Sequence, residues 1–439
     1  MQTLTIHKGF TLHIAGVPEM KTESVLNPNY VALLPKTIPH IKPCLLVHKG
    51  DRVSIGTPLC VDKQHEYINI VSPGAGIISD IEYGDRRSIE AIVIQLGPTE
   101  TYVEIQPLSK VELEGISRDK LIEYFIKTGV WPFIRSLPFR TIANPETQPR
   151  FLIVSSNTLE PFHPHPEIFL HEHHEVFQLG LLALAKLPSE KLHVCSCDAM
   201  ESSSIDIKGM YPADDPGSIV YHMKKSPEEN RAWYVTTQDV IHLGQALKYG
   251  RYPIERTICI GGSKASKPMH IQTRAGVPIS EILQHQSKHE SSRYIAGGIF
   301  RGYTTKLTSY LGFYDDSLLI IEQGNKKEFL GFIRPGYDKP SFSRSFLSTF
   351  NRKPFPMDCN VHGDTRACIS CGYCEQVCAV DILPQFMYKS LIADEIEEAL
   401  AHGLLDCVEC GLCTYVCPSK IELTTMFSSA KKTYHDEQG

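Results

Sequence analysis

The chain reads Cys368-Ile-Ser-Cys371-Gly-Tyr-Cys374-Glu-Gln-Val-Cys378 and, further on, Cys407-Val-Glu-Cys410-Gly-Leu-Cys413-Thr-Tyr-Val-Cys417. The spacing C-x2-C-x2-C-x3-C therefore occurs twice. In iron–sulfur proteins, three thiolates at these intervals bind one [4Fe–4S] cluster and the fourth binds the neighbouring cluster. The spacing predicts one cluster on Cys368, Cys371, Cys374 and Cys417. It predicts the other on Cys407, Cys410, Cys413 and Cys378.

Zinc is the alternative ligand for these cysteines, because C-x2-C pairs also occur in zinc sites. A zinc ion takes four ligands, and two complete runs of four are not needed in a zinc ribbon or finger. The second run continues into Pro418, as expected for a ferredoxin, whereas the first run continues into Ala379. We therefore expect iron bound through the same eight cysteines, and no catalytic acid or nucleophile is predicted.

Length and composition limit the class of protein. A chain of 439 residues with 42% apolar residues is long enough for about three domains. The 44 basic and 50 acidic residues give a net charge of −6, which argues against a nucleic-acid partner. The N-terminus lacks the pattern of a signal peptide, and no apolar run is long enough to span a bilayer. We expect a soluble or peripheral chain in a reducing compartment, with the remaining cysteines as buried thiols. These are Cys44, Cys60, Cys195, Cys197, Cys259 and Cys359.

Residues 1–100 are predicted to contain an N-terminal segment and a small β domain. Short β-branched runs broken by glycine between residues 43 and 96 indicate a sandwich of short strands. The phrases Val47–Val53 and Ser72–Ile77 resemble the barrel-sandwich hybrid of biotinyl and lipoyl carriers. In that family a lysine on an exposed hairpin is modified, and Lys63 lies near the matching hairpin. The flanking residues differ and the spacing to Pro73 is longer, so a structural module is favoured over a modified carrier.

Residues 101–255 alternate between helical and strand patterns, which predicts an α/β domain. Helices are expected at 119–126 and 175–185, and strands at 150–154 and 192–195. A nucleotide site would require a G-x-G-x-x-G loop between a strand and a helix, and the sequence contains none. FMN and NADH are therefore not expected on this chain.

Five histidines precede the second of these helices, and they admit two interpretations. They are His163, His165, His171, His173 and His174. A metal site needs fixed geometry and outer-shell support. Pro161, Pro164 and Pro166 break the stretch, so a solvated turn before the helix is favoured over a metal site. Residues 211–217 are likewise predicted to form a turn-rich connector.

The last two predicted domains are a β-grasp domain of the SLBB-like kind at 256–335 and a helical iron–sulfur domain at 336–439. Strands are expected at 257–260, 293–299 and 317–321. A Pro- and Ser-rich linker at 335–343 follows. Helical periodicity at 389–403 predicts one helix between the two cysteine runs, ended by Gly403.

This order of domains resembles the A-subunit family (NqrA) of the sodium-translocating NADH:quinone reductases and, more distantly, the C subunit of the Rnf complexes. Phrases similar to the A-subunit family are Lys8-Gly9, Ile14–Gly16, Gly129–Trp131, Gln238–Ile241 and Phe342–Leu347. The Rnf protein is expected to carry a glycine-rich loop for flavin and NADH. This chain has residues 128–135 at that place, without such a loop.

The resemblance implies an α+β multidomain protein: a barrel-sandwich hybrid, a degenerate Rossmann-like domain, a β-grasp domain and a helical ferredoxin. It implies a peripheral component of a six-subunit complex on the cytoplasmic face of the bacterial inner membrane. In that family NADH oxidation and ubiquinone reduction drive Na+ transport. NADH enters on another component of the complex, and ubiquinone contacts the A-subunit. Proteins of the A-subunit family usually have an eroded cysteine set, whereas this chain keeps all eight.

A quinone pocket needs an apolar slot with a few polar groups. Trp131, Phe133, Arg135 and Phe139 are candidates to line it, and ordinary packing is the alternative explanation for them. Two other functions remain open. One is an NADH-oxidising or ferredoxin-linked electron-transfer component of the Rnf kind. The other is a non-catalytic assembly protein whose clusters only hold its tail together.

Overall fold

The computed structural model describes residues 2–25, 27–197, 202–226, 229–286, 291–325 and 331–438. Within these residues the strands form four sheets, followed by a helical C-terminal region. No helix among them is long and apolar enough to cross a bilayer. Short 3-10 segments lie at Pro35–Thr37, Asp85–Arg87, Trp131–Phe133, His171–His173, Leu283–His285, Gly331–Ile333, Leu347–Phe350 and Leu404–Asp406.

Two small antiparallel sheets form the N-terminal β domain, and they confirm the short strands predicted between residues 43 and 96. One sheet has the order β3-β9-β8-β5 and the other β4-β6-β7. Their strands are β3 Tyr30–Leu33, β4 Pro43–Leu45, β5 Arg52–Val53, β6 Pro58–Asp62, β7 His65–Val71, β8 Gly76–Tyr83 and β9 Ile89–Leu96. Fully buried Ile55, Leu59, Ile70 and Ile94 fill the space between the sheets. Lys63 lies exposed in the turn between β6 and β7.

The first two strands of the chain lie outside these small sheets. Strand β1 (Gln2–Thr5) pairs in parallel with β14 (Ile205–Lys208), at the edge of the large central sheet. Strand β2 (Thr22–Val25) pairs in parallel with β17 (Met269–Arg274), in the following domain. The N-terminal segment therefore ties together two sheets that are built mainly from later residues.

The central sheet has the order β1-β14-β13-β12-β15-β10-β11, and the pairs from β1 to β15 are parallel. Its other strands are β10 Arg135–Ser136, β11 Thr141–Ile142, β12 Phe151–Ser155, β13 Lys191–Ser196 and β15 Trp233–Thr236. The helices of this region are α1 Lys110–Gly115, α2 Arg118–Lys127, α3 Glu167–Leu170, α4 His174–Leu184, α5 Pro216–Met223 and α6 Thr237–Tyr249. The predicted α/β domain and its two helices are confirmed.

Helices α4 and α6 pack closely because each carries a glycine at the contact. A Cβ atom on Gly180 would overlap the carbonyl oxygen of Val240, and one on Gly244 would overlap that of Val176. Glycine is unfavourable inside a helix by roughly 0.5–1 kcal/mol. Here that cost is offset by the burial of the two helix faces against each other.

The third sheet is mixed, with the order β19-β18-β20-β16-β17-β2. It contains β16 Glu255–Gly261, β18 Ser292–Ala296, β19 Tyr303–Thr305 and β20 Ser317–Glu322, and α7 (Ile279–Ile282) follows β17. The predicted strands are present, and β20 is buried along almost its whole length. The assignment of this sheet to the β-grasp class, and the domain boundaries, stay predictions.

The C-terminal region contains α8 Tyr373–Val377, α9 Pro384–Ile392, α10 Ile396–Ala401, α11 Leu412–Val416 and α12 Leu423–Gln438. The prediction of one helix at 389–403 is wrong, because α9 ends at Ile392 and α10 begins at Ile396. Asp394 between them has a φ of 58°, a left-handed conformation that no continuous α-helix contains. Gly403 follows with a φ of 99°, as expected for a helix end.

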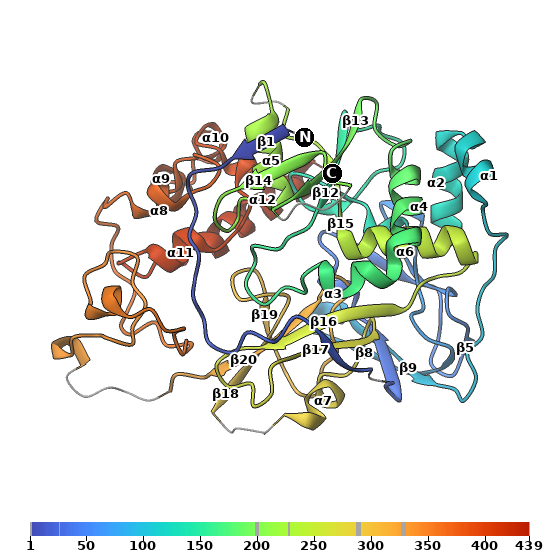
Figure 1. Cartoon of the computed structure of the whole chain (residues 1–439), viewed down its shortest axis with the longest axis horizontal. Helices are drawn as coiled ribbons and strands as arrows, with labels where there is room; N and C mark the ends of the chain where they lie inside the picture. The colour runs from blue at the N-terminus through green and yellow to red at the C-terminus, as the bar shows by residue number, and fades with distance from the viewer. Residues whose placement is uncertain are drawn as a thin grey trace.

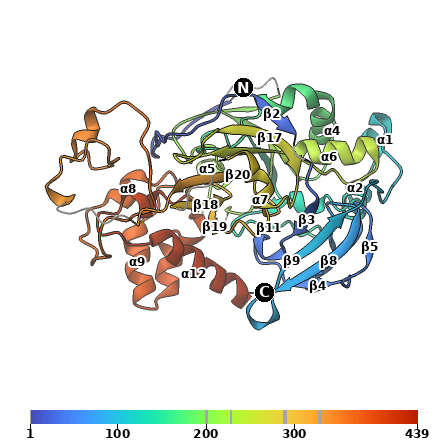
Figure 2. The same cartoon turned by 90° about the horizontal axis from the view of Figure 1, so that it is seen from below.

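Figure 1 shows α8 to α11 at one end of the molecule and β5 at the other, with the central sheet between them. Figure 2 shows α12 running from the cysteine region toward β4. The C-terminal helix therefore runs between the cysteine region and the N-terminal β domain (Figure 2).

Candidate iron–sulfur site

The two cysteine runs have the same backbone conformation. Helices α8 and α11 each begin after a left-handed glycine, Gly372 with a φ of 75° and Gly411 with a φ of 78°. Each helix ends at the fourth cysteine of its run, where Cys378 and Cys417 have φ values of −72° and −69°. The repeated cysteine spacing in the sequence therefore corresponds to a repeated backbone conformation.

One cavity brings together cysteines from both runs. It has about 380 Å³ of empty space, part of it open to solvent, and is lined by Cys378 from the first run and by Cys407, Cys410 and Cys413 from the second. Apolar side chains make up most of the remaining wall, including Val380, Leu412 and Phe427. These four cysteines are the crosswise set predicted from the spacing.

Burial keeps these thiols protonated when no cation is present. It raises the pKa of Cys378 to about 12, and the neighbouring Cys410 and Cys407 contribute to the rise. The pKa of Cys407 is likewise raised to about 12, chiefly by burial. Cysteine binds metals as the thiolate, so a positively charged group must compensate for the buried negative charges, and its binding releases protons.

The first set of cysteines is more open to solvent. Cys371 is exposed, Cys368 and Cys417 are half-buried, and Cys374 is buried. The pKa of Cys374 is raised to about 11 by burial, with further contributions from Cys371 and Cys417. Cys417 therefore lies close enough to interact electrostatically with the first run, as crosswise ligation requires.

The spacing of the thiols does not match a zinc site. Zn–S bonds of about 2.3 Å in a tetrahedron place the sulfur atoms about 3.8 Å apart. Among the described residues, one group of three or more His, Cys, Asp or Glu side chains has its ligand atoms within 4.8 Å of one another, and it contains no cysteine. The cysteines are thus farther apart than a single tetrahedral ion requires.

Positive side chains surround the second set. Lys431 of α12 donates from Nζ to the carbonyl oxygen of Cys407 at 2.9 Å, and its side chain is 3% exposed. Arg140 donates to the carbonyl oxygen of Val408 at 3.2 Å. The hydroxyl of Tyr211 donates to the carbonyl oxygen of Cys410 at 3.0 Å. These contacts fix the loop of the second run against the α/β domain.

Two acids balance these cations: Glu409 pairs with Lys431 at 2.6 Å, and the buried Asp215 pairs with Arg140. Asp215 caps α5, accepts from Arg140 at 2.8 Å and pairs with Arg301 at 2.6 Å. Burial opposes its charge, but Arg140 and Arg301 hold the pKa of Asp215 at about 2. The turn predicted at 211–217 is present at 211–215, and α5 begins at Pro216. The buried charge of Asp215 was not predicted. The sequence signal that could have identified it is Asp215 directly before Pro216. Aspartate is favoured at a helix N-cap and proline at the first helical position.

The four candidate quinone residues are not brought together. Trp131 is fully buried and donates from Nε1 to the carbonyl oxygen of Ala143. Phe133 stacks within the core, and the Arg135 guanidinium lies between two tyrosine rings. Phe139 lies elsewhere, its ring 4.7 Å from that of His435. Each of the four has a packing role, and their binding of a quinone stays a prediction.

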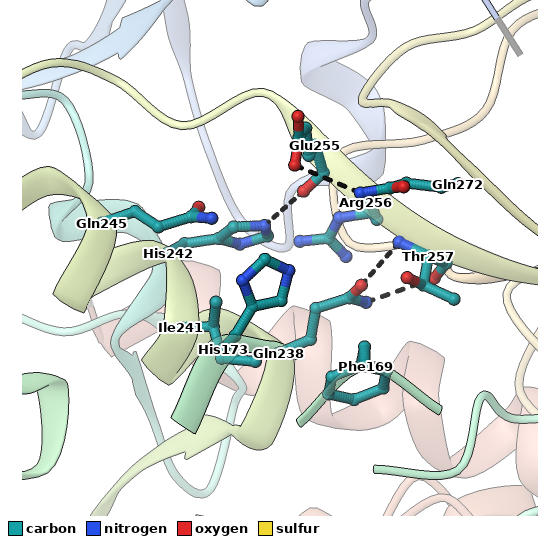
Figure 3. Close-up of a pocket in the computed structure, with 10 residues that line it drawn as sticks. All are labelled: Phe169, His173, Gln238, Ile241, His242, Gln245, Glu255, Arg256, Thr257 and Gln272. Atoms are coloured by element: carbon teal, nitrogen blue, oxygen red, sulfur yellow. Dashed lines mark hydrogen bonds between the residues drawn. The ribbon is translucent and has the colours of Figure 1, made fainter. Parts of the chain in front are cut away.

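The five histidines before α4 do not form a group of ligands within the described part of the chain. His171 and His174 are exposed, as a solvated turn predicts. His163 departs from that prediction, because its side chain is 14% exposed and its Nδ1 lies 3.1 Å from Asp316. Figure 3 shows His173 pointing between His242 and Gln238 in a pocket of about 270 Å³.

This pocket lies at the seam between α6 and β16. The backbone N–H of Thr257 donates to the side chain of Gln238 at 2.6 Å, and Arg256 donates to Asp239 at 2.8 Å. The segment 238–241, one of those that resemble the A-subunit family, therefore connects the α/β domain to the third sheet through hydrogen bonds.

Three family descriptions match the chain. "NqrA N-terminal barrel-sandwich hybrid domain" matches residues 4–97, and "NqrA second alpha/beta domain" matches residues 116–252. "4Fe-4S dicluster domain" matches residues 367–421, which include both cysteine runs. The expected order of a barrel-sandwich domain, an α/β domain and an iron–sulfur region is thus confirmed.

Curated relatives match over almost the whole chain. The A-subunit of the Na(+)-translocating NADH-quinone reductase of Rhodopirellula baltica is 32% identical over 415 residues, 91% of each chain. Proteins of the same description from Yersinia pestis and Neisseria meningitidis are each 30% identical over 413 residues, 92% of each chain. Among solved structures, an NAD+-reducing [NiFe]-hydrogenase aligns with 51% of this chain and 52% of its own at 11% identity. Its TM-score of 0.31 is too low to bear on fold or function.

Proposed function

Because the chain belongs to the A-subunit family of the Na(+)-translocating NADH-quinone reductases, we propose that it works as one component of such a complex. In this proposal the complex oxidises NADH, reduces ubiquinone and moves Na+ across a membrane. The chain contributes to the ubiquinone-reducing step and holds two [4Fe–4S] clusters. Partner subunits hold it at the cytoplasmic face of the membrane.

The main support for this proposal is the cavity that is lined by cysteines from both runs. Cys378, Cys407, Cys410 and Cys413 line one apolar space, although Cys378 lies far from the other three in sequence. This donor set of four thiols, too widely spaced for one zinc ion, suits a cluster with an iron at each corner. Clusters of this type supply one-electron transfer when bound.

The repeat of the backbone supports a second cluster on Cys368, Cys371, Cys374 and Cys417. The residues around the second set have separate tasks. Lys431 and Arg140 hold the loop of the second run through its carbonyl oxygens, and Phe427 and Leu412 exclude water from the cavity. Exclusion of water and fixed positive charge both influence the reduction potential of an iron–sulfur centre.

The test is an anaerobic preparation of the whole chain, analysed for iron, labile sulfide, flavin and zinc. We expect about eight irons and eight sulfides per chain, which is two clusters of four. One or two zinc ions per chain without iron would refute the clusters. Because membrane attachment is a separate part of the proposal, it is tested separately: the chain should sediment with membranes only when the integral subunits of the complex are present.

A redox titration of the same sample distinguishes the alternative functions. Clusters that stay oxidised at strongly reducing potentials would favour an assembly role. Bleaching of the clusters by NADH, or tight FMN in the isolated chain, would favour an Rnf-like role. Reduction of the clusters by partner subunits, with no NADH reaction in the isolated chain, is the result expected here.

A further inference from the structure

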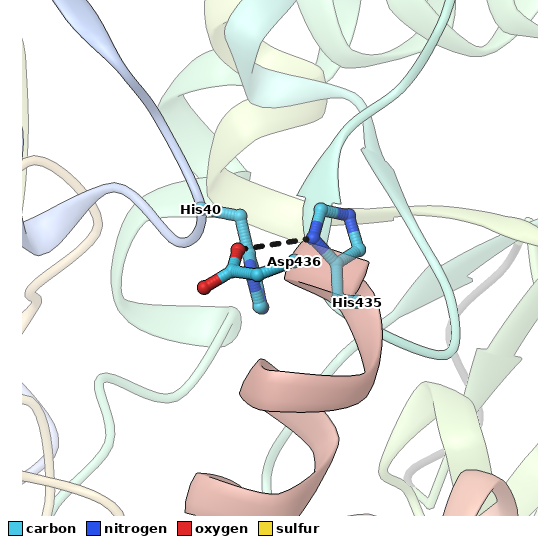
Figure 4. Close-up of side chains that lie close together, drawn as sticks. All are labelled: His40, His435 and Asp436. Atoms are coloured by element: carbon cyan, nitrogen blue, oxygen red, sulfur yellow. Dashed lines mark ion pairs between the residues drawn. The ribbon is translucent and has the colours of Figure 1, made fainter. Parts of the chain in front are cut away.

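Two histidines from opposite ends of the chain meet beside the C-terminal helix. His40 lies in the loop before β4, and His435 lies near the end of α12. Their ring centroids are 4.1 Å apart. One ligand atom from each ring and a carboxylate oxygen of Asp436 all lie within 4.8 Å of one another (Figure 4). Within the described part of the chain, this is the one such group of His, Cys, Asp or Glu side chains.

The two rings leave buried nitrogen atoms without partners. The Nδ1 atoms of His40 and His435 are both buried, and neither has a hydrogen-bond partner among the residues that the structure describes. The Nδ1 of His435 lies 3.7 Å from the carboxylate of Asp436, which is too long for a hydrogen bond. A buried polar atom without a partner costs roughly 1–3 kcal/mol. Two such nitrogen atoms side by side need an explanation. An ion bound between them would supply the missing partner of both.

The surroundings suit a metal ligand. The ring of Phe139 lies 4.7 Å from His435 and 6.0 Å from His40, which shields one side from water. His40 adopts a φ of 58°, so the loop holds this side chain in an uncommon conformation.

We propose that His40, His435 and Asp436 bind a divalent transition-metal ion, with Zn2+ as the best fit. Two imidazole nitrogens and one carboxylate oxygen are ligands that zinc accepts, at about 2.0–2.2 Å, and a water molecule completes a tetrahedron. Bonds of this length place tetrahedral ligand atoms about 3.3 Å apart, so the three ligand atoms, now within 4.8 Å of one another, move closer when the ion binds. The bound ion joins α12 to the N-terminal β domain and so fixes the helix that carries Lys431. This inference does not depend on the proposed electron-transfer function.

The test uses the full chain with its clusters loaded, titrated with Zn2+ by calorimetry under anaerobic conditions. We expect one Zn2+ per chain. His40→Gln and His435→Gln should each weaken binding by more than the roughly 10-fold that loss of an outer-shell partner costs. His48→Gln is the matched control, because that side chain is 91% exposed and is not part of the ligand group. It should bind Zn2+ like the wild type.

Iron and labile sulfide are measured in every variant, so that a loss of folding is not mistaken for a loss of ligand. X-ray absorption at the zinc edge of the wild-type chain provides an independent measurement. Nitrogen and oxygen neighbours at about 2.0–2.1 Å support the site. Sulfur neighbours at about 2.3 Å would place the zinc on the cysteines and overturn the proposal. Equal affinity in wild type and both variants, or no binding at all, would also overturn it.

Discussion

Replacement of Cys378 by alanine should remove the cluster that we propose for the other cysteine run. Cys378 belongs to the first run by sequence, but its side chain lines a cavity with Cys407, Cys410 and Cys413. A site left with three of its four thiols loses its cluster or holds it incompletely. Cys378→Ala should therefore lower the iron content from about eight to about four per chain. The cluster on the first set should survive.

The assay must identify which cluster is lost, and two reference variants provide this. Cys374→Ala lacks a ligand that belongs to the first set under any pairing, and Cys413→Ala lacks one that belongs to the second. Electron paramagnetic resonance of the dithionite-reduced samples then gives a spectrum for each surviving cluster. The spectrum of Cys378→Ala should match that of Cys413→Ala.

A match between Cys378→Ala and Cys374→Ala would refute the crosswise assignment, because it would mean that each run binds its own cluster. Loss of both clusters in Cys378→Ala alone would also contradict the reasoning. The structure places Cys378 in the cavity that contains Cys407, Cys410 and Cys413. The cysteines that contribute to the raised pKa of Cys374 are instead Cys371 and Cys417.

Four further outcomes are expected. Gly244→Ala should lower the free energy of unfolding by about 3 kcal/mol in anaerobic urea titrations, the upper end of overpacking costs, whereas Gly115→Ala, which meets open space, should be neutral. Asp239→Asn should cost about 3–5 kcal/mol in the same assay, because it leaves buried arginine charge without its partner. Burial opposes protonation of His163, but Asp316 and other acids raise its pKa, so its stabilising contribution is present below pH about 6.5 and declines as pH rises further. The stability difference between wild type and His163→Gln should accordingly shrink as the pH rises above about 6.5, and a constant difference would disprove the charge pairing. Calorimetry of the isolated chain with NADH should show no micromolar binding, because no glycine-rich loop offers backbone N–H groups to a pyrophosphate.

The elements predicted from local patterns agree with the structure because local patterns determine them. The helix at 119–126 appears as α2 and ends before Gly129, which has a φ of 76°. The buried strand at 317–321 appears as β20. The helix at 389–403 is the exception, since its apolar periodicity continues through Asp394 although the backbone turns there. Periodicity detects a buried face but not a short break in it.

The candidate site likewise has one part that local sequence patterns predict and one part that they do not. Cysteine spacing is a local signal, and the crosswise set follows from it because one short helix carries each fourth cysteine to the other run. The meeting of Arg140, Asp215 and Arg301 is not local. These residues come from three separate segments that pack only in the folded chain. No spacing rule identifies such a network, and the same holds for His40 and His435.

The failure of the four aromatic and basic residues at 131–139 to form one slot has a physical reason. The segment makes a 3-10 turn and then the short strand β10, which lies between β15 and β11, so that successive side chains point to different sides. Trp131 and Phe133 enter the core, whereas Phe139 contacts α12. A run of aromatic residues predicts burial more reliably than it predicts a shared cavity, because the large apolar area of each ring favours burial wherever it points.

The two cysteine sets differ in a way that bears on the direction of electron transfer. Beside the second set, the buried cations Lys431 and Arg140 are each paired with an acid, Glu409 at 2.6 Å and Asp215 at 2.8 Å, so their charges are largely cancelled. Beside the first set, Cys371 is exposed and Lys389 contacts Ser370 at the surface. Water stabilises the more negative, reduced state of a centre better than an apolar cavity does. The first set should therefore give the higher reduction potential, and an electron that enters at the buried second set would move outward, toward the exposed Cys371.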